Sequence, residues 1–196
     1  MKNIGVLISG GGSNLQAIID ACESGILKGL ARVAVVVSNR ADAYGLERAE
    51  KHKIPAFFFN PRDFNANSAY CSMISGELRK HKVDIVCLAG YMSLIDPCLL
   101  NDFKNKIINI HPALLPKYGG KGMYGHHVHK AVIAAGESES GVTVHWVNEV
   151  YDSGEIILQR KVPVLINDTP EELAARVLAV EHIAYPEAIL KILKQG

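Results

Sequence analysis

Four apolar runs, rich in valine and isoleucine, constrain the fold of this chain most strongly. They are residues 3–9 (NIGVLIS), 33–37 (VAVVV), 84–89 (DIVCLA) and 107–110 (IINI), and helical spacing recurs between them. Strands that are apolar on both faces are typical of a parallel sheet covered by helices, joined by right-handed crossovers. We therefore predict an α/β fold: a Rossmann-like, mostly parallel sheet flanked by helices.

The segments between these runs complete the first half of the predicted fold. Ser13 begins a helix, and Gln16 three residues later gives a capping-box pattern. Asp96 followed by Pro97 begins a short helix. The remaining elements are predicted as helices over 44–52 and 67–80 and a short strand over 56–59.

The second half changes character after a loop rich in glycine and proline. Residues 126–135 are predicted as a helix. Residues 141–147 alternate and 155–164 partly do, with a turn-rich connection between them, so we predict an antiparallel pair there. Thr169 and Glu172 cap a final helix, which Pro186 is expected to break or kink.

Size and charge limit the classes of function. A chain of 196 residues suits a single core, and 21 basic against 20 acidic side chains leave a net charge of +1. We expect no nucleic-acid partner, because no basic face or arm is present. No apolar run has the length of a membrane helix and no export signal is visible, so we expect a cytoplasmic protein with no membrane partner. Its cysteines are then expected to be reduced: Cys22, Cys71, Cys87 and Cys98.

The stretch NIHPALLPKYGG, residues 109–120, places two polar side chains at the end of an apolar strand. Asn109 and His111 project to the same face, and Pro112 ends the strand. Active sites of open α/β sheets lie at this carboxyl end. The alternative is a strand end whose polar groups simply bond to loop backbone.

Two further segments offer polar groups. The loop ISGGGSN, residues 8–14, lets backbone amides at a helix start bind an anion, although a plain turn would need the same glycines. It matches neither a Walker loop nor the dinucleotide fingerprint. Asp152 lies in a turn and could simply bond its own backbone; if that turn folds over His111, its charge is expected to raise the pKa of the imidazole.

The other histidines are not expected to bind metal. His126, His127 and His129 form a cluster, but no nearby cysteine or glutamate completes a ligand set. Three others are interpreted as structural residues without partners: His52, His81 and His145.

Several of these stretches together resemble one family. GVLISGGGSNLQAIIDA, LAGYM, INIHPALLPKY and GVTVHWVNEVYDSGEII occur in order over nearly the whole chain. They are similar to the folate-dependent formyltransferases, and within them to the phosphoribosylglycinamide formyltransferases. The resemblance implies an enzyme that transfers a formyl group from 10-formyltetrahydrofolate, as cosubstrate, to the amine of glycinamide ribonucleotide in purine biosynthesis, without a metal.

The resemblance also implies an organisation and a set of site residues. Residues 1–196 would form one formyltransferase domain, with a nucleotide- and phosphate-binding half at 1–100 and a catalytic and folate-binding half at 101–196. Its partners would be these small molecules, bound by a monomer or homodimer. The implied catalytic residues are Asn109, His111 and Asp152; Gly12, Ser13 and Asn14 would hold the substrate phosphate, and Glu181 the ribose hydroxyls, unless it is an ordinary helix-surface carboxylate. The implied folate contacts are Leu88, Tyr91, Met92, Leu94, Ile95, Leu100 and Val147.

Three positions depart from the family pattern. Ser93 and Asn67 stand where familiar members carry arginines, so the folate tail is expected to be held differently. Glu155 replaces a proline and is expected to face solvent.

Three other functions are alternatives to the transferase. A formyl-folate hydrolase of the same fold normally carries an extra amino-terminal domain, and a methionyl-tRNA formyltransferase an extra carboxyl-terminal one, so we expect neither function here. A noncatalytic nucleotide-binding module would keep ISGGGSN but would not need Asn109, His111 and Asp152 together.

Overall fold

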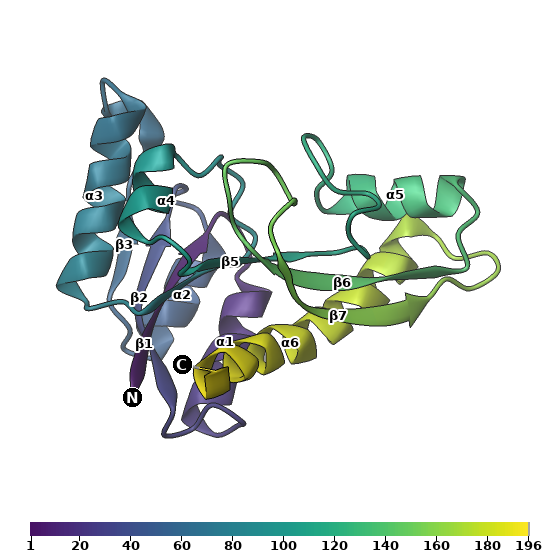
Figure 1. Ribbon diagram of the computed structural model, residues 1–196, viewed down its shortest axis with the longest axis horizontal. Helices are drawn as coiled ribbons and strands as arrows, with labels where there is room; N and C mark the ends of the chain where they lie inside the picture. Colours follow the sequence, from purple (N-terminus) through teal and green to yellow (C-terminus); the bar gives the residue numbers. More distant parts are fainter. Residues whose placement is uncertain (196) are drawn as a thin grey trace. The chain divides into compact units, whose positions relative to one another are not determined.

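The computed structural model describes residues 1–195, which fall into two compact units. The first comprises Met1–Ile108, and the second begins at Asn109. Each is described separately below, with the elements labelled in Figure 1.

The first unit is built on parallel strands in the order β3-β2-β1-β4. Ile4 and the run from Val6 to Ile8 are completely buried in the central strand, as the apolar run 3–9 predicts. The strands are β1 (Lys2–Ile8), β2 (Ala31–Ser38), β3 (Ala56–Phe58) and β4 (Ile85–Leu88). The predicted parallel α/β sheet is confirmed in this unit.

Helices connect these strands, and one predicted cap is wrong. The helix α1 begins at Ser13, but its N-cap is Gly12, in the left-handed conformation at φ 69°. Ser13 is therefore already helical, and the Gln16 side chain donates to Asp20 instead. The helical segments of this unit are α1 (Ser13–Glu23), α2 (Tyr44–Lys51), the 3-10 turn η1 (Pro61–Asp63), α3 (Asn67–Lys80) and α4 (Pro97–Asp102).

The strand β5 (Ile107–His111) leads into the second unit, where β5, β6 and β7 are neighbours in that order. The strands β6 (Glu139–Trp146) and β7 (Ile156–Pro163) are antiparallel, which confirms the predicted pair. The helix α5 (His126–Ala134) precedes β6, and α6 (Pro170–Gln195) ends the described chain.

The long helix α6 confirms one prediction and corrects another. Its capping box forms: the Thr169 N–H donates to Glu172 at 2.8 Å, and the Glu172 N–H donates to the Thr169 hydroxyl at 3.2 Å. Pro186 does not end the helix, which continues to Gln195. Tyr185 and Ile189 are buried on either side of the proline, so packing compensates for the missing backbone donor.

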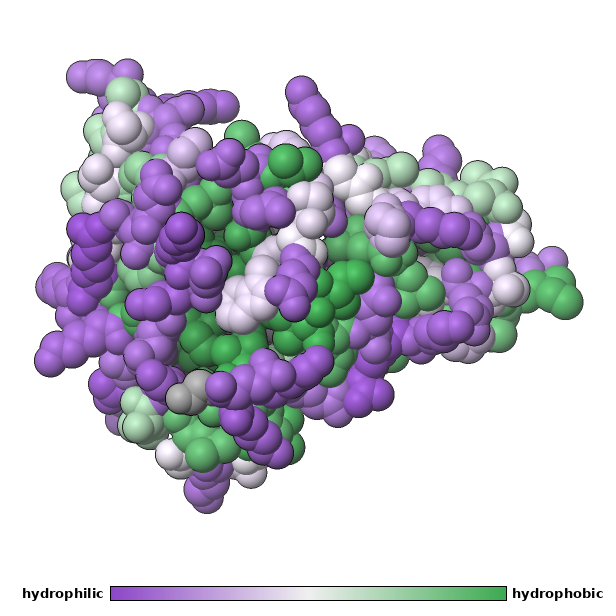
Figure 2. Space-filling view, in the orientation of Figure 1, coloured by the Kyte–Doolittle hydropathy of each residue, from purple (hydrophilic) through white to green (hydrophobic). Residues whose placement is uncertain are grey.

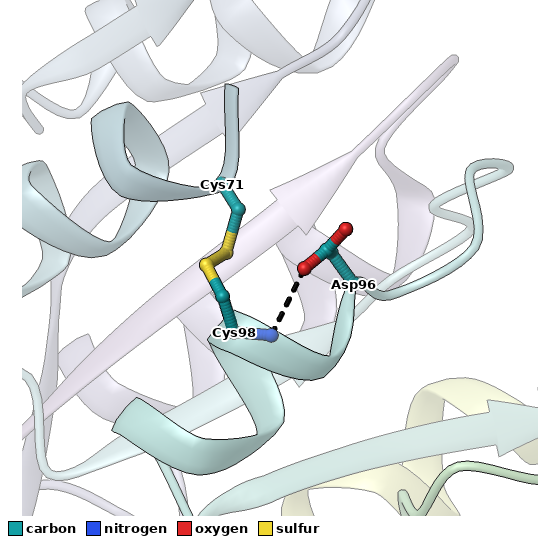
Figure 3. Close-up of side chains that lie close together, drawn as sticks. All are labelled: Cys71, Asp96 and Cys98. Carbon is teal, nitrogen blue, oxygen red and sulfur yellow. Dashed lines mark hydrogen bonds between the residues drawn. A yellow bond between two sulfur atoms is a disulfide. The ribbon is translucent and has the colours of Figure 1, made fainter. Parts of the chain in front are cut away.

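The prediction that all cysteines are reduced is wrong for one pair. Cys71 of α3 and Cys98 of α4 form a disulfide, with their Cα atoms 6.4 Å apart (Figure 3). That distance is typical of a disulfide, but a separation of 27 residues hides it in the sequence. Cys22 and Cys87 are free thiols.

The surface is that of an ordinary globular chain. Hydrophilic side chains, shown in purple, cover much of the face seen in Figure 2. None of the helices over residues 1–195 is both long and apolar enough to span a membrane.

Candidate active site

The structure brings the polar residues of β5 together with Asp152 and with a histidine of β6. His111 Nδ1 lies 3.6 Å from Asp152 Oδ2, and His145 Nε2 lies 3.6 Å from Asp152 Oδ1. Asn109 Nδ2 is 3.3 Å from His145 Nε2. All four residues belong to the second unit, and the two histidine side chains are almost completely buried. We call Asn109, His111, His145 and Asp152 the polar cluster.

Asp152 is held in place by its backbone and by the loop around it. It adopts φ 52°, in the left-handed region where aspartate is among the few tolerated side chains. Its Oδ2 accepts the Gly120 N–H at 2.9 Å. Burial opposes the charge on Asp152, but His145, His111 and Gly120 together hold its pKa below the usual value. The cluster therefore contains a carboxylate at neutral pH.

The connection that carries Asp152 leaves no room for a side chain at its end. A Cβ placed on Gly154 would lie 1.7 Å from the Trp146 carbonyl oxygen. Nearby, the Trp146 N–H donates to the Glu155 carbonyl at 2.9 Å. This close approach fixes the end of the connection against β6, two residues beyond the carboxylate.

His111 has a defined tautomer and a lowered pKa. Its Nε2 lies 2.7 Å from the Tyr118 carbonyl oxygen, which can only accept, so Nε2 carries a hydrogen and Nδ1 faces Asp152. Burial lowers the pKa of His111, and the charge of Asp152 only partly opposes this shift. The expectation of a raised pKa is therefore wrong, because desolvation of a side chain that is 3% exposed outweighs a carboxylate 3.6 Å away.

His145 is the member of the cluster that sequence reasoning missed. The β6–β7 register shifts between Val144 and His145, and such bulges redirect side chains next to active sites. Its Nδ1 donates to the Trp146 carbonyl at 2.9 Å, and its Nε2 lies 3.3 Å from Asn109 Nδ2 and 3.6 Å from Asp152 Oδ1. A signal was available: like His111, His145 is a polar residue at the end of an apolar strand.

Two side chains fix the beginning of the loop that follows β5. The Thr143 hydroxyl donates to the Ala113 carbonyl at 2.6 Å and accepts the Leu115 N–H at 3.0 Å. Gln159 Nε2 donates to the Leu115 carbonyl at 2.9 Å. These bonds tie the residues before Tyr118 to β6 and β7, and so support its contact with His111.

The glycine loop lies in the first unit, and its outer residues face open space. Apart from the adjoining residues, no atom of the described chain is within 4 Å of a Cβ built on Gly10 or Gly11. Gly12 differs, because its positive φ and a Cβ position 2.7 Å from the Gly45 Cα both require glycine. The loop leads directly into α1, with Gly10 and Gly11 exposed and Gly12 and Ser13 half-buried.

Glu181, predicted to bind ribose hydroxyls, lies in α6 and is 8% exposed. It is therefore not an ordinary helix-surface carboxylate. Burial of a carboxylate is costly unless polar groups surround it, so polar partners are expected around Glu181.

The predicted folate contacts of the first unit differ in exposure. Leu88 and Ile95 are buried, whereas Met92 and Leu94 expose 57% and 62% of their surface. Tyr91 and Leu100 are half-buried, as is Val147 in the second unit. Exposed neighbouring apolar side chains are typical of a surface that receives a ligand.

The segment from Tyr91 to Ser93 is fastened by three hydrogen bonds. The Tyr91 and Tyr70 hydroxyls are 2.9 Å apart, and the Met92 N–H donates to the Ser9 hydroxyl at 2.8 Å. Ser93 Oγ accepts from Asn39 at 2.7 Å. Ser93, one of the positions that depart from the family pattern, therefore takes part in a hydrogen bond within the protein.

The other two departures are exposed. Asn67 lies at the first residue of α3 and Glu155 just before β7. The prediction that Glu155 faces solvent is confirmed.

The remaining histidines belong to no group of three possible metal ligands within residues 1–195. Within residues 1–195, the group of three possible metal ligands whose donor atoms lie within 4.8 Å is Cys71, Asp96 and Cys98, and it contains the disulfide. The expectation that His52 and His81 lack partners is wrong: His52 contacts Glu23 at 2.9 Å and His81 contacts Glu77 at 3.0 Å.

Comparisons with known proteins agree with the motifs. A family model described as formyl transferase matches residues 2–189. The phosphoribosylglycinamide formyltransferase of Haemophilus influenzae is 47% identical over 96% of this chain and 86% of its own length. The trifunctional purine biosynthetic protein adenosine-3 of Chironomus tentans is 46% identical over 96% of this chain, which spans 13% of that longer protein.

Solved structures give the same result. The crystal structure of glycinamide ribonucleotide transformylase 1 from Symbiobacterium toebii superimposes with a TM-score of 0.93 at 46% identity, covering 100% of this chain and 89% of that one. The predicted fold is thereby confirmed, and the relatives' names favour a transferase over a hydrolase or a noncatalytic module.

Proposed function

The chain belongs to the formyl transferase family, and from this premise we propose that it transfers a formyl group from 10-formyltetrahydrofolate to the amine of glycinamide ribonucleotide. The products are formyl-glycinamide ribonucleotide and tetrahydrofolate. The observation that carries the proposal is the polar cluster: the Asp152 carboxylate lies 3.6 Å from each of two imidazoles, and the Asn109 carboxamide lies 3.3 Å from one of them.

The first chemical step is attack of the neutral amine on the formyl carbon. The carbonyl electrons move to oxygen, and a tetrahedral oxyanion forms. One N–H of Asn109 is directed to His145, which leaves the second for the oxyanion. The Nε2–H of His111 is the other donor, and the formyl oxygen replaces the Tyr118 carbonyl as its acceptor. One such donor is typically worth about 3 kcal/mol.

The second requirement is the movement of protons. The attacking nitrogen loses one proton, and the folate nitrogen gains one as its bond to the formyl carbon breaks. Asp152 is charged and adjacent to both histidines, so it accepts the first proton directly or through water. It also stabilises His111 whenever that ring becomes protonated. Positioned acid–base groups contribute roughly a hundredfold to ten-thousandfold.

Substrate binding is assigned to the predicted contacts. The amides of Gly12, Ser13 and Asn14 hold the phosphate at the start of α1, and the buried Glu181 accepts hydrogen bonds from the ribose hydroxyls. The pterin lies against the apolar residues between Leu88 and Leu100, and Val147 contributes from the β6–β7 connection. No step requires a metal.

The setting follows from the same function. One formyltransferase domain uses residues 1–100 mainly for the nucleotide and 101–196 for catalysis and folate. It acts in the cytoplasm on small molecules, without nucleic acid, as a monomer or homodimer.

One assay tests this function against the alternatives. The protein is mixed with formyl-folate, and deformylation is followed with and without glycinamide ribonucleotide. We expect turnover only when the amine is present, with one formylated product per folate released. Equal turnover without the amine would identify a hydrolase, and no turnover in either case would identify a binding module.

A further inference from the structure

One face of α3 holds α4 through three consecutive turns. Cys71, Ser75 and Arg79 are spaced by four residues and therefore point to the same side. Cys71 is bonded to Cys98, the Ser75 hydroxyl donates to Asp102 at 2.5 Å, and Arg79 forms an ion pair with the same aspartate. Because Cys98 and Asp102 are also four residues apart, the two helices meet along matching faces, with the covalent bond at the start of α4.

The start of α4 directly follows residues 91–95, which belong to the segment proposed to bind folate. Asp96 accepts the Cys98 N–H at 2.9 Å and caps the helix, as Figure 3 shows. The residue before it is Ile95, and the hydroxyl pair of Tyr70 and Tyr91 secures the other end of the segment. Residues 91–98 are thus tied to α3 at both ends, but covalently only at Cys98.

The two bonded cysteines differ in exposure. Cys71 is 2% exposed, whereas Cys98 is half-buried at the start of α4. An attacking thiolate therefore reaches the Sγ of Cys98 first, and the Sγ of Cys71 is the leaving group. A buried leaving sulfur takes up a proton from solvent as the site opens, because burial disfavours the thiolate.

We propose that Cys71 and Cys98 form a reversible thiol–disulfide site whose state sets how tightly residues 91–100 bind formyl-folate. The co-reactants are small thiols and their disulfides. In reduction, a thiolate attacks Cys98 Sγ, the Sγ–Sγ bond breaks, and Cys71 leaves as a thiol. A second thiolate then releases Cys98 and a small-molecule disulfide, so two electrons pass from the small thiols to the protein.

The composition of the group supports an exchanging pair over a metal centre. Cys71, Cys98 and Asp96 offer three donors, whereas a closed zinc site uses four. In compartments where thiols are kept reduced, disulfides are usually transient or redox-sensing. Burial raises the pKa of the remaining half-buried thiol, Cys22, to about 11, so it does not compete.

The first test measures the bond itself and is independent of activity. The protein is equilibrated with glutathione at graded ratios of thiol to disulfide, quenched with acid, and its free thiols are counted after unfolding. We expect two thiols in the oxidised form, Cys22 and Cys87, and four after dithiothreitol, with full return on reoxidation. Four thiols at every ratio, or a pairing other than 71 with 98 in peptide maps, would refute the proposal.

The second test measures the consequence for the folate segment, and it rests on the proposed function. Reduction is expected to increase amide hydrogen exchange over residues 91–102 and to weaken binding of 5-formyltetrahydrofolate by about fivefold, which corresponds to roughly 1 kcal/mol. KM for formyl-folate should rise equally, with kcat and KM for the amine substrate unchanged. Identical exchange and affinity in the two states would overturn the inference.

Two variants make the result specific. Cys98→Ser should behave as the reduced protein under all conditions, because it keeps the hydrogen bonds of Asp102 and loses only the covalent tie. Cys22→Ser removes a thiol outside the pair and should keep the full response. A redox response that persists in Cys98→Ser would refute the site.

Failure of the proposed function is distinguishable from failure of this inference. If neither state transfers a formyl group, the function is wrong while the thiol counts and hydrogen exchange still test the site. If formyl transfer is normal but reduction changes neither hydrogen exchange nor folate affinity, the proposed function is supported and the redox site is refuted.

Discussion

The glycine loop before α1 and the polar cluster of β5, β6 and the β6–β7 connection differ in the groups that form them. The loop presents backbone amides, and Gly12 is required because a side chain there would meet Gly45. The cluster consists of side chains, and the histidines within it are nearly inaccessible. A substitution that adds a side chain is expected to disrupt a site formed by backbone amides. A substitution that removes a side chain is expected to disrupt a site formed by side chains. The following predictions test this difference.

Removal of the imidazole should have the largest effect. We expect His111→Ala to lower kcat/KM by about a thousandfold, or roughly 4 kcal/mol, because an oxyanion donor is lost. Affinity for glycinamide ribonucleotide, measured by calorimetry, should change little. The exposed His127→Ala serves as the matched control. A His111→Ala enzyme within tenfold of the parent would remove this residue from the mechanism.

Neutralising the carboxylate should rank second. Asparagine tolerates the φ of 52° at position 152 and can still accept the Gly120 N–H, so Asp152→Asn changes little besides the charge. We expect kcat to fall about a hundredfold, the lower end of acid–base effects. Steady-state rates at saturating substrates measure this. An unchanged kcat would show that the carboxylate only positions the loop.

Adding one methyl group to the glycine loop should rank third and act on stability and binding. Gly12→Ala places an alanine at φ 69° against the Gly45 Cα, and we expect a loss of about 2 kcal/mol in unfolding free energy, with a raised KM for the ribonucleotide. Denaturant titration provides the measurement. Gly76→Ala, in the exposed middle of α3 with open space around it, is the control and should stabilise by about 0.5–1 kcal/mol. Equal changes in unfolding free energy for the two substitutions would show that position 12 does not specifically require glycine.

The smallest effect should appear in the pH dependence of stability. The folded pKa of His111 is lowered, so the unfolded chain binds a proton first as the pH falls below about 6.5. Stability is complete above that value and is lost on acidification until the folded protein also binds the proton, with a slope of at most about 1.4 kcal/mol per pH unit. His111→Ala should show a shallower loss between pH 6.5 and the folded pKa. Superimposable curves for the two proteins would contradict the lowered pKa.

Features encoded locally were predictable from the sequence. The apolar runs identified β1, β2, β4 and β5, and alternation identified β6 and β7. The helix α3 was placed at its observed ends, because hydrophobic periodicity acts over neighbouring residues. Asn109 and His111 could be paired because a strand fixes the direction of residues two apart.

Features that depend on distant contacts were not predictable. His145 joins the cluster through a register shift between β6 and β7, and the lowered pKa of His111 comes from burial by residues far along the chain. The pairing of Cys71 with Cys98 depends on how α3 meets α4. Pro186 was misjudged because packing around α6 overrides its local preference.

The lack of space at Gly154 divides the β6–β7 connection into a fixed base and an adjustable tip. Asp152 stands two residues from the base, while Val150 and Tyr151 are largely exposed at the tip. Substitutions or insertions can therefore accumulate at the tip during evolution, or be engineered there, while the position of the Asp152 carboxylate stays unchanged.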